Sequence, residues 1–288
     1  MTRTAFAAAK VNLYLHVAPP TPDGYHPIAS LMAFADVGDT IAGAPAAELS
    51  MTIDGPFGAG LSAGSDNLVL RAAAALLARA GRPQAGATLV LTKALPIAAG
   101  LGGGSSDAGA ALRLLNAMHG LGFDDLALES VAAEIGADGP ACLRARLLTA
   151  EGRGEQLSPG PSMPPLPAVL VNPGVPSPTG AVYRAYDASG APGAADRPEP
   201  PPLRTPRAAA EWLARCRNDL EAPALLTEPR IGEALEALRA EPESLLVRMS
   251  GSGATSFALT ATHADAEALA SRLSAAHPTW WVKACTLA

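Results

Sequence analysis

One run of small residues constrains this chain more than any other: the segment from Gly100 to Ser106, which reads Gly-Leu-Gly-Gly-Gly-Ser-Ser. Because glycine has no Cβ, successive backbone N–H groups in such a run can turn toward one anion. The alternating stretch 87–92 predicts a strand before the segment, and apolar spacing over 107–118 predicts a helix after it. A helix start adds unpaired amides and a partial positive charge. The segment therefore predicts a phosphate loop, with a flexible turn ending in a serine N-cap as the alternative.

This phosphate loop differs from two common nucleotide-binding motifs. No Gly-Lys-Ser/Thr ends it, as a Walker loop requires. The dinucleotide pattern Gly-x-Gly-x-x-Gly fails at Ser105. The loop thus predicts an anion site without placing the chain in either of those classes.

Charge and composition limit the other functions. The 288 residues are 49% hydrophobic and carry a net charge of −6 without a basic stripe, which argues for a globular protein and against binding to nucleic acid. Lys10 and Asn12 interrupt the apolar N-terminal stretch, and no apolar run is long enough to span a bilayer. Three widely spaced cysteines, Cys142, Cys216 and Cys285, predict neither a disulfide framework nor a zinc site. We expect a cytoplasmic protein with no nucleic-acid or membrane partner.

Lysine is scarce in this chain, which has 18 arginines but only three lysines: Lys10, Lys93 and Lys283. A lysine kept against such a bias suggests a need for a compact ammonium group, which suits a phosphate oxygen. No motif surrounds Lys283, so it serves as the control for this argument.

Periodicity predicts an α+β protein with strands and helices in both halves. Helices are expected at 67–80, 107–118, 126–135, 208–217, 231–240 and 264–275. Strands are expected at 7–17, 87–92, 245–249 and 255–259. The first strand should be half-buried, with its polar side chains on one face. Prolines are dense over 158–206, with an exposed loop expected at 189–202 and a domain boundary near Leu157.

Three segments resemble the motifs of the GHMP kinases, the family of galactokinase, homoserine kinase, mevalonate kinase and phosphomevalonate kinase. The ATP-binding signature resembles Pro96, Ile97, Ala98, Ala99, Gly100, Leu101, Gly102, Gly103, Gly104, Ser105 and Ser106, continuing into Asp107 and Ala108. The other two motifs resemble Ala9–Leu15 and Met249–Ala254. Further blocks are similar to family members whose substrate carries a cytidine diphosphate: Asp23–His26, Gly136–Asp138, Glu151–Glu155 and Asn218–Glu221.

The resemblance implies a fold and a class of reaction. It implies an N-terminal domain of ribosomal-protein-S5-like type at 1–157 and a ferredoxin-like domain at 158–288. It also implies ATP as co-substrate with Mg²⁺, and a small-molecule alcohol as phosphoryl acceptor. We expect a monomer or weak homodimer. There are two alternatives to a kinase for a cytidine-diphosphate substrate. One is another GHMP kinase, acting on mevalonate, homoserine or a sugar, and the other is a non-catalytic ATP sensor on the same fold.

The resemblance assigns Asp138 as the base at the substrate hydroxyl, and Lys10 as the group that orients it and steadies the transferring phosphoryl. Without the resemblance, Asp138 would read as a turn residue in Gly-Ala-Asp-Gly-Pro. Keeping both residues argues against the sensor.

The remaining assignments concern the two substrates. Tyr25 and Tyr183 are expected to stack on cytosine and His26 to bond its edge, which mevalonate, homoserine and sugars would not need. Asn12 is suited to a diphosphate or ribose contact. Asn67 and Lys93 are expected near the adenosine. The hydroxyl of Ser105 or Ser106 could bond phosphate or Mg²⁺, and no cluster of residues has the spacing of a resident metal site.

Overall fold

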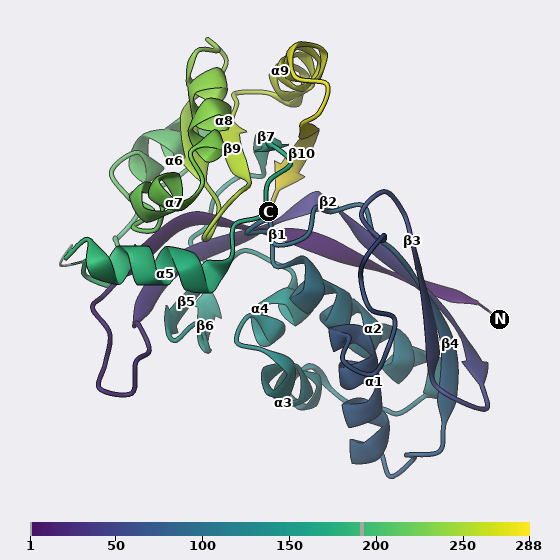
Figure 1. The fold of residues 1–288 in the computed structure, drawn as a ribbon. Helices are drawn as coiled ribbons and strands as arrows, with labels where there is room; N and C mark the ends of the chain where they lie inside the picture. Colours follow the sequence, from purple (N-terminus) through teal and green to yellow (C-terminus); the bar gives the residue numbers. More distant parts are fainter. Residues whose placement is uncertain (1, 191–192) are drawn as a thin grey trace. The chain divides into compact units, whose positions relative to one another are not determined.

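The computed structural model describes residues 2–190 and 193–288 and has an α+β fold, as predicted (Figure 1). The chain divides into two compact units, and neither is continuous in sequence. The first unit comprises the residues up to Ala9 together with Gly38–Leu95 and Gly102–Ala145. The second comprises Lys10–Val37, Pro96–Leu101 and Arg146–Ala288. The chain therefore passes between the units several times, and one of these passages is the phosphate loop.

The first unit is a sheet with helices packed against it. Its strands are β1 (Arg3–Val17), β2 (Ile28–Ala46), β3 (Ser50–Asp54) and β4 (Gly86–Thr92), of which β1 and β2 continue into the second unit. Its helices are α1 (Leu68–Arg79), α2 (Gly103–His119), α3 (Asp125–Ile135) and α4 (Gly139–Arg144). Strand β4 pairs antiparallel with β2, with Thr92 opposite Thr40, and parallel with β3, with Thr88 opposite Ser50.

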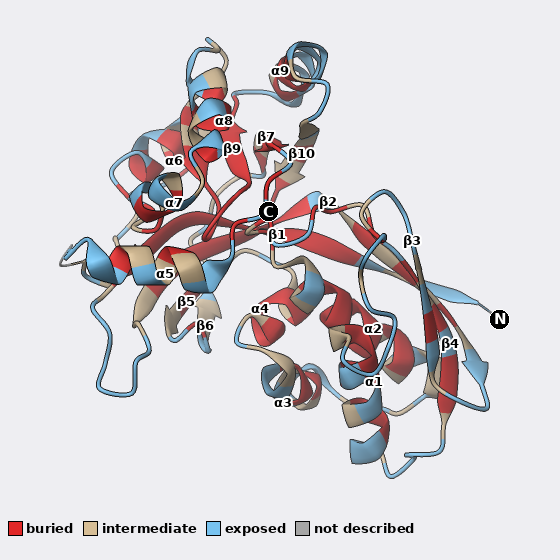
Figure 2. Cartoon of the chain, in the orientation of Figure 1, coloured by how far each residue is buried: buried red, intermediate tan, exposed pale blue. Residues whose placement is uncertain are grey.

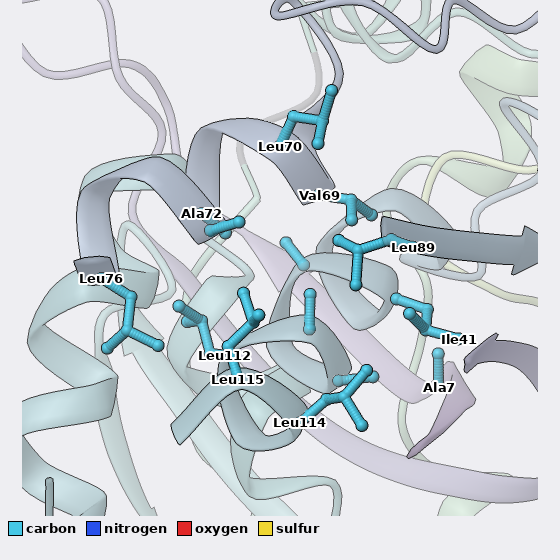
Figure 3. Packing of buried hydrophobic residues seen from close by; sticks show 14 of the residues in the cluster. Ala7, Ile41, Val69, Leu70, Ala72, Leu76, Leu89, Leu112, Leu114 and Leu115 are labelled. Carbon is cyan, nitrogen blue, oxygen red and sulfur yellow. The ribbon is translucent and has the colours of Figure 1, made fainter. Parts of the chain in front are cut away.

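The core of the first unit lies between its strands and helices (Figure 3). Leu76 of α1 and Leu112 and Leu115 of α2 are fully buried, as are Ile41 of β2 and Leu89 of β4. Burying a leucine or isoleucine side chain contributes about 2 kcal/mol. This cluster therefore holds α2, and with it the end of the phosphate loop, against the sheet.

The second unit contains a further set of strands and helices. Its strands are β5 (Leu148–Gly152), β6 (Gln156–Pro159), β7 (Leu166–Asn172), β8 (Leu246–Met249), β9 (Ser256–Leu259) and β10 (Trp281–Leu287). Its helices are α5 (Thr179–Ala188), α6 (Pro206–Leu213), α7 (Glu221–Thr227), α8 (Arg230–Arg239) and α9 (His263–Ala276). Strand β10 pairs antiparallel with β7 and meets β2 where Leu287 lies opposite Ala35. Strand β9 joins β7 to β8, and β5 pairs with both β2 and β6.

Strand β1 differs from the prediction because both of its faces are buried rather than one. Figure 2 shows β1 buried over most of its length, and Asn12, Tyr14 and His16 are each at most 2% exposed. Trp212 of α6 packs edge-on to Tyr14, with ring centroids 6.1 Å apart, and so covers the face expected to meet water. The polar side chains on that face therefore need partners within the protein.

Two helix boundaries also differ from the prediction. Helix α2 begins at Gly103 instead of residue 107, so the last glycines of the phosphate loop form its first turn. Helix α6 ends at Leu213 instead of 217, because the backbone of Arg217 and Asp219 bonds to Leu15 of β1.

The proline-dense stretch contains more regular structure than expected, since β7 and α5 both lie within it. The loop predicted at 189–202 has no helix or strand in its described residues, and positions 191 and 192 lie outside them. Leu157, the predicted domain boundary, lies in β6. That boundary stays a prediction.

Candidate active site

The phosphate loop leads directly into α2 in the first unit. Gly102, just before the helix, has φ 63°, in the left-handed region that favours glycine. Its carbonyl accepts the first helical bond, from the amide of Ser106 at 2.9 Å. The helix itself offers no partner to the amides between these two residues, and Gly104 is exposed. The helix start therefore presents backbone N–H groups and the positive end of its dipole.

The earlier part of the loop is fixed within the second unit. The hydroxyl of Ser250 donates to the carbonyl of Gly100 at 2.9 Å, and the amide of Lys10 donates to the carbonyl of Leu101 at 2.8 Å. Gly100 has φ 73°, and a Cβ there would overlap the carbonyl oxygen of Ser250. Only glycine therefore fits this position without moving the backbone.

A buried ion cluster lies beside the loop in the first unit, and it is formed by Lys93 directly after β4, Asp39 of β2 and Asp107 of α2. The ammonium of Lys93 donates to Asp39 Oδ2 and, at 2.7 Å, to Asp107 Oδ2. A Cβ on Gly103 would lie 3.0 Å from Lys93 Nζ, so the cluster sits directly against the loop. We call these three side chains the Lys93 cluster.

Burial and charge oppose each other in the Lys93 cluster. Burial alone would lower the pKa of Lys93, but the negative charges of Asp107 and Asp39 outweigh it and raise that pKa. Burial, and then the charge of Asp39, raise the pKa of Asp107 to about 7 despite the attraction of Lys93. Within the described part of the chain, Asp107 Oδ1 and the hydroxyl of Ser106 are buried without a hydrogen-bond partner.

Asp138 immediately precedes α4 in the first unit and is half-buried. Its carbonyl accepts the first helical bond, from the amide of Cys142 at 2.9 Å, but its side chain makes no capping bond. A Cβ on Gly139 would overlap the carbonyl oxygen of Ala132 in α3, so glycine permits the close approach that places Asp138 here. A capping role, the simplest structural explanation for this aspartate, is therefore absent.

Lys10 and Asn12 lie together on β1 in the second unit, as the alternation predicted. Lys10 Nζ donates to Asn12 Oδ1 at 3.0 Å, and Asn12 Nδ2 donates to Ser30 Oγ at 2.7 Å. Lys10 is only 6% exposed and Lys93 only 4%, whereas Lys283 is exposed. The two lysines that lie in motifs are therefore buried and the control is at the surface, while their expected role toward phosphate stays a prediction.

The second glycine-rich segment, 250–254, is held by Asn218. Its side-chain amide donates to the carbonyls of Met249 and Gly251, each at 2.8 Å, and its oxygen accepts from the amide of Leu220 at 3.0 Å. Asn12 also contacts this segment, because its backbone amide donates to Ser250 Oγ at 3.1 Å. These bonds connect the family motifs at 9–15, 218–221 and 249–254, and the bonded residues all lie in the second unit.

The structure brings His26 and Tyr183 together, with ring centroids 5.0 Å apart. His26 Nδ1 donates to the carbonyl of Ala18 at 2.9 Å, and Nε2 lies 3.2 Å from a carboxylate oxygen of Asp187. Tyr186 packs against the same imidazole edge-on at 5.6 Å. Both ring nitrogens of His26 therefore already face protein oxygens.

Tyr25 lines an open pocket of about 480 Å³ in the second unit. The guanidinium of Arg153 lies 4.1 Å from the centre of its ring and also pairs with Asp23. Tyr25 is 56% exposed, so much of its ring is open to a ligand.

Asn67 has a structural task that the sequence did not assign. Its Oδ1 accepts from the amide of Val69 at 2.9 Å and so caps α1, while its Nδ2 donates to the carbonyl of Ser62. Contacts of Asn67 and Lys93 with adenosine stay predictions.

The sequence did not indicate Asp39 and Tyr186 as residues of the candidate site, because each contacts partners that are distant in sequence and leave no local pattern.

Residues 2–190 and 193–288 contain neither a cluster of metal ligands nor a membrane-spanning helix. No group of three or more His, Cys, Asp or Glu side chains there is arranged to hold a metal ion. No helix in these ranges is both long and apolar enough to cross a membrane.

Comparison with known proteins identifies the class to which this fold and phosphate loop belong. The model of the GHMP kinases N terminal domain matches residues 67–146, and that of the GHMP kinases C terminal domain matches residues 203–279. Together the two matches cover more than half of the sequence. The protein belongs to the GHMP kinase family.

Two relatives and one solved structure that match this chain over its full length are kinases of one substrate within this family. The 4-diphosphocytidyl-2-C-methyl-D-erythritol kinase of Caulobacter vibrioides (strain NA1000 / CB15N) is 61% identical over 100% of both chains. Its namesake from Caulobacter sp. (strain K31) is 57% identical over 100% of this chain and 99% of its own. A crystal structure of 4-(cytidine 5'-diphospho)-2C-methyl-D-erythritol kinase matches with a TM-score of 0.77 and 37% identity, covering 100% of this chain and 99% of the other.

Proposed function

We propose that this protein transfers the terminal phosphoryl group of ATP to the 2-hydroxyl of 4-diphosphocytidyl-2-C-methyl-D-erythritol, a step in non-mevalonate isoprenoid precursor biosynthesis. The observation that carries the proposal is 61% identity, over the full length of both chains, to an enzyme named for that substrate. The protein would act in the cytoplasm as a monomer or weak homodimer. Its three cysteines are all buried, and none forms a disulfide among the described residues, which suits a reducing compartment.

The phosphate loop would hold ATP through its backbone. The exposed amides at the start of α2 match phosphate oxygens, and the helix dipole favours negative charge there. Mg²⁺ would arrive with the nucleotide and neutralise charge on its phosphates. The hydroxyl of Ser106, buried and without a hydrogen-bond partner among the described residues, is an oxygen donor of the kind that this cation prefers.

Asp138 and Lys10 would serve the acceptor hydroxyl. Asp138 would take the hydroxyl proton as the oxygen attacks phosphorus, and the Lys10 ammonium would stabilise charge on the transferring group. The 3.0 Å bond to Asn12 fixes where that ammonium sits on β1. Both groups act on charge that develops in the transition state, so they should affect kcat more than binding.

Aromatic side chains of the second unit would recognise the cytosine. Tyr25 and Tyr183 offer ring faces for stacking, and His26 lies against Tyr183. Because Asp187 faces His26 Nε2, a bond from this nitrogen to the base would displace that carboxylate. A substrate without a base would leave these groups unused.

An ADP-release assay against a panel of alcohols tests the proposal. We expect ATP consumption with 4-diphosphocytidyl-2-C-methyl-D-erythritol and a product phosphorylated at the 2-hydroxyl. Faster turnover with mevalonate, homoserine or a sugar would assign the protein to another kinase of the family. ATP binding without turnover of any alcohol would instead indicate a sensor.

A further inference from the structure

The described side-chain hydrogen bonds of Asp39 all go to residues 93–95, the segment that enters the phosphate loop. This fully buried residue of β2 accepts from the amides of Ala94 and Leu95 through Oδ1, at 2.6 and 2.8 Å. Its other oxygen accepts from the ammonium of Lys93. One carboxylate therefore fixes three consecutive residues at the point where the chain leaves the first unit.

Lys93 extends this hold to the other end of the loop. Its ammonium also donates to Asp107 Oδ2 at 2.7 Å, in the first turn of α2, where the chain has returned to the first unit. The segment between them, Pro96–Leu101, makes its described backbone contacts with the second unit instead. The Lys93 cluster thus holds together the two segments that flank the phosphate loop, residues 93–95 before it and Asp107 after it.

The net charge of the Lys93 cluster indicates that it would favour phosphate binding by fixing the geometry of the loop, not by electrostatic attraction. With both carboxylates ionised, the cluster carries one ammonium against two negative charges, and such a group repels phosphate. What it can supply is a fixed separation between the loop ends. Ordering a flexible loop during binding costs free energy, and a loop already held in its binding geometry avoids that cost.

We propose that Asp39 is a positioning residue for ATP: through Lys93, Ala94 and Leu95 it sets the geometry in which the phosphate loop meets the nucleotide. The inference rests on the proposed assignment of this loop to the phosphates of ATP. Asp39 lies outside the motifs described above and is fully buried, so it would act without touching the nucleotide.

The test compares Asp39→Asn with Asp36→Asn in the full-length protein. Asp36 is a matched control, because it lies on the same strand and accepts one backbone bond, from the amide of Thr286 at 2.8 Å, but is exposed. The probe is the non-hydrolysable analogue adenosine 5′-(β,γ-imido)triphosphate with Mg²⁺, titrated by calorimetry. We expect Asp39→Asn to raise its Kd about tenfold or more, and Asp36→Asn to leave it within about twofold of wild type.

The titration separates positioning from folding. Loss of folded protein lowers the number of sites per chain, whereas a misplaced loop raises the Kd of sites that remain. If Asp39→Asn does not fold, Asp107→Ala decides, because it frees the α2 end and leaves Lys93 neutralised by Asp39. We expect it to raise the Kd about fivefold.

A Kd within twofold of wild type in folded Asp39→Asn, or in Asp107→Ala where the first does not fold, would overturn the inference. No alcohol is present, so an error in the acceptor substrate leaves the experiment unaffected. A wild-type protein that does not bind the analogue would refute the phosphate-loop assignment and this inference together.

Discussion

Replacing Asp107 with asparagine should change how the stability of the protein depends on pH. Burial, with the charge of Asp39, raises the pKa of Asp107 from its ordinary 3.8 to about 7, against the attraction of Lys93. The folded protein therefore holds this proton more tightly than the unfolded chain does. The stability gained from that proton is fully present below about pH 4 and is lost as the pH rises through about 7.

The size of the effect follows from the distance between the two pKa values. Each pH unit corresponds to about 1.4 kcal/mol, so the full loss is on the order of 4 kcal/mol. Between pH 5 and pH 8 the wild-type protein should lose about 3 kcal/mol of this contribution. Asparagine does not ionise. Relative to wild type, Asp107→Asn should therefore gain about 3 kcal/mol in its free energy of unfolding over that range.

Urea unfolding of both proteins at several pH values between 5 and 8 measures this difference. Groups that titrate in both proteins, such as the histidines, cancel when the two free energies are subtracted. Asp36→Asn, which removes an exposed carboxylate from β2, controls for the change in net charge. If the difference between wild type and Asp107→Asn stays constant to within about 0.5 kcal/mol, Lys93 keeps Asp107 ionised throughout and the reasoning is wrong.

Three further predictions concern the loops and the proposed catalytic pair. Gly103→Val should weaken ATP binding, because its Cβ would lie 3.0 Å from Lys93 Nζ and its methyl groups would crowd the phosphates; unchanged affinity in a folded variant would exclude a phosphate site here. Asn218→Ala removes three buried hydrogen bonds and should cost about 3 kcal/mol in urea unfolding, and a loss under about 1 kcal/mol would show that water replaces them. Asp138→Asn and Lys10→Met should each lower kcat on the order of 100-fold with little change in KM, and the double variant should be scarcely slower than the worse single one. Additive losses in that steady-state comparison would mean independent roles.

The sequence predicted helices well where one face is apolar over several turns. Expected at 67–80, α1 spans Leu68–Arg79, because Asn67 caps it and leucine and alanine recur at helical spacing. The 19-residue strand β2 was missed. Residues 29–35 are buried on both faces and so show no alternation, and Gly38 looks like a turn. In fact, a Cβ at Gly38 would overlap the carbonyl of Ala7, so this glycine permits close strand contact.

The candidate site divides in the same way. Local patterns were sufficient to predict a glycine-rich loop that leads into a helix and to place Lys10 beside Asn12, since residues two apart on a strand share a face. Asp39 lies 54 residues from Lys93 in sequence, and nothing near it indicates a buried carboxylate. Partners brought together only by the sheet register between β2 and β4 cannot be read from either strand alone.

The discontinuous units have a consequence for synthesis on the ribosome. A nascent chain of 145 residues already contains every segment of the first unit. The second unit is different, because β10 supplies the strand that pairs with β7 and meets β2 at Ala35. The sheet that contains β2 residues of this unit is therefore complete only after Trp281–Leu287 has been synthesised. The first unit can therefore fold while translation continues, and the second can finish only after β10 has emerged.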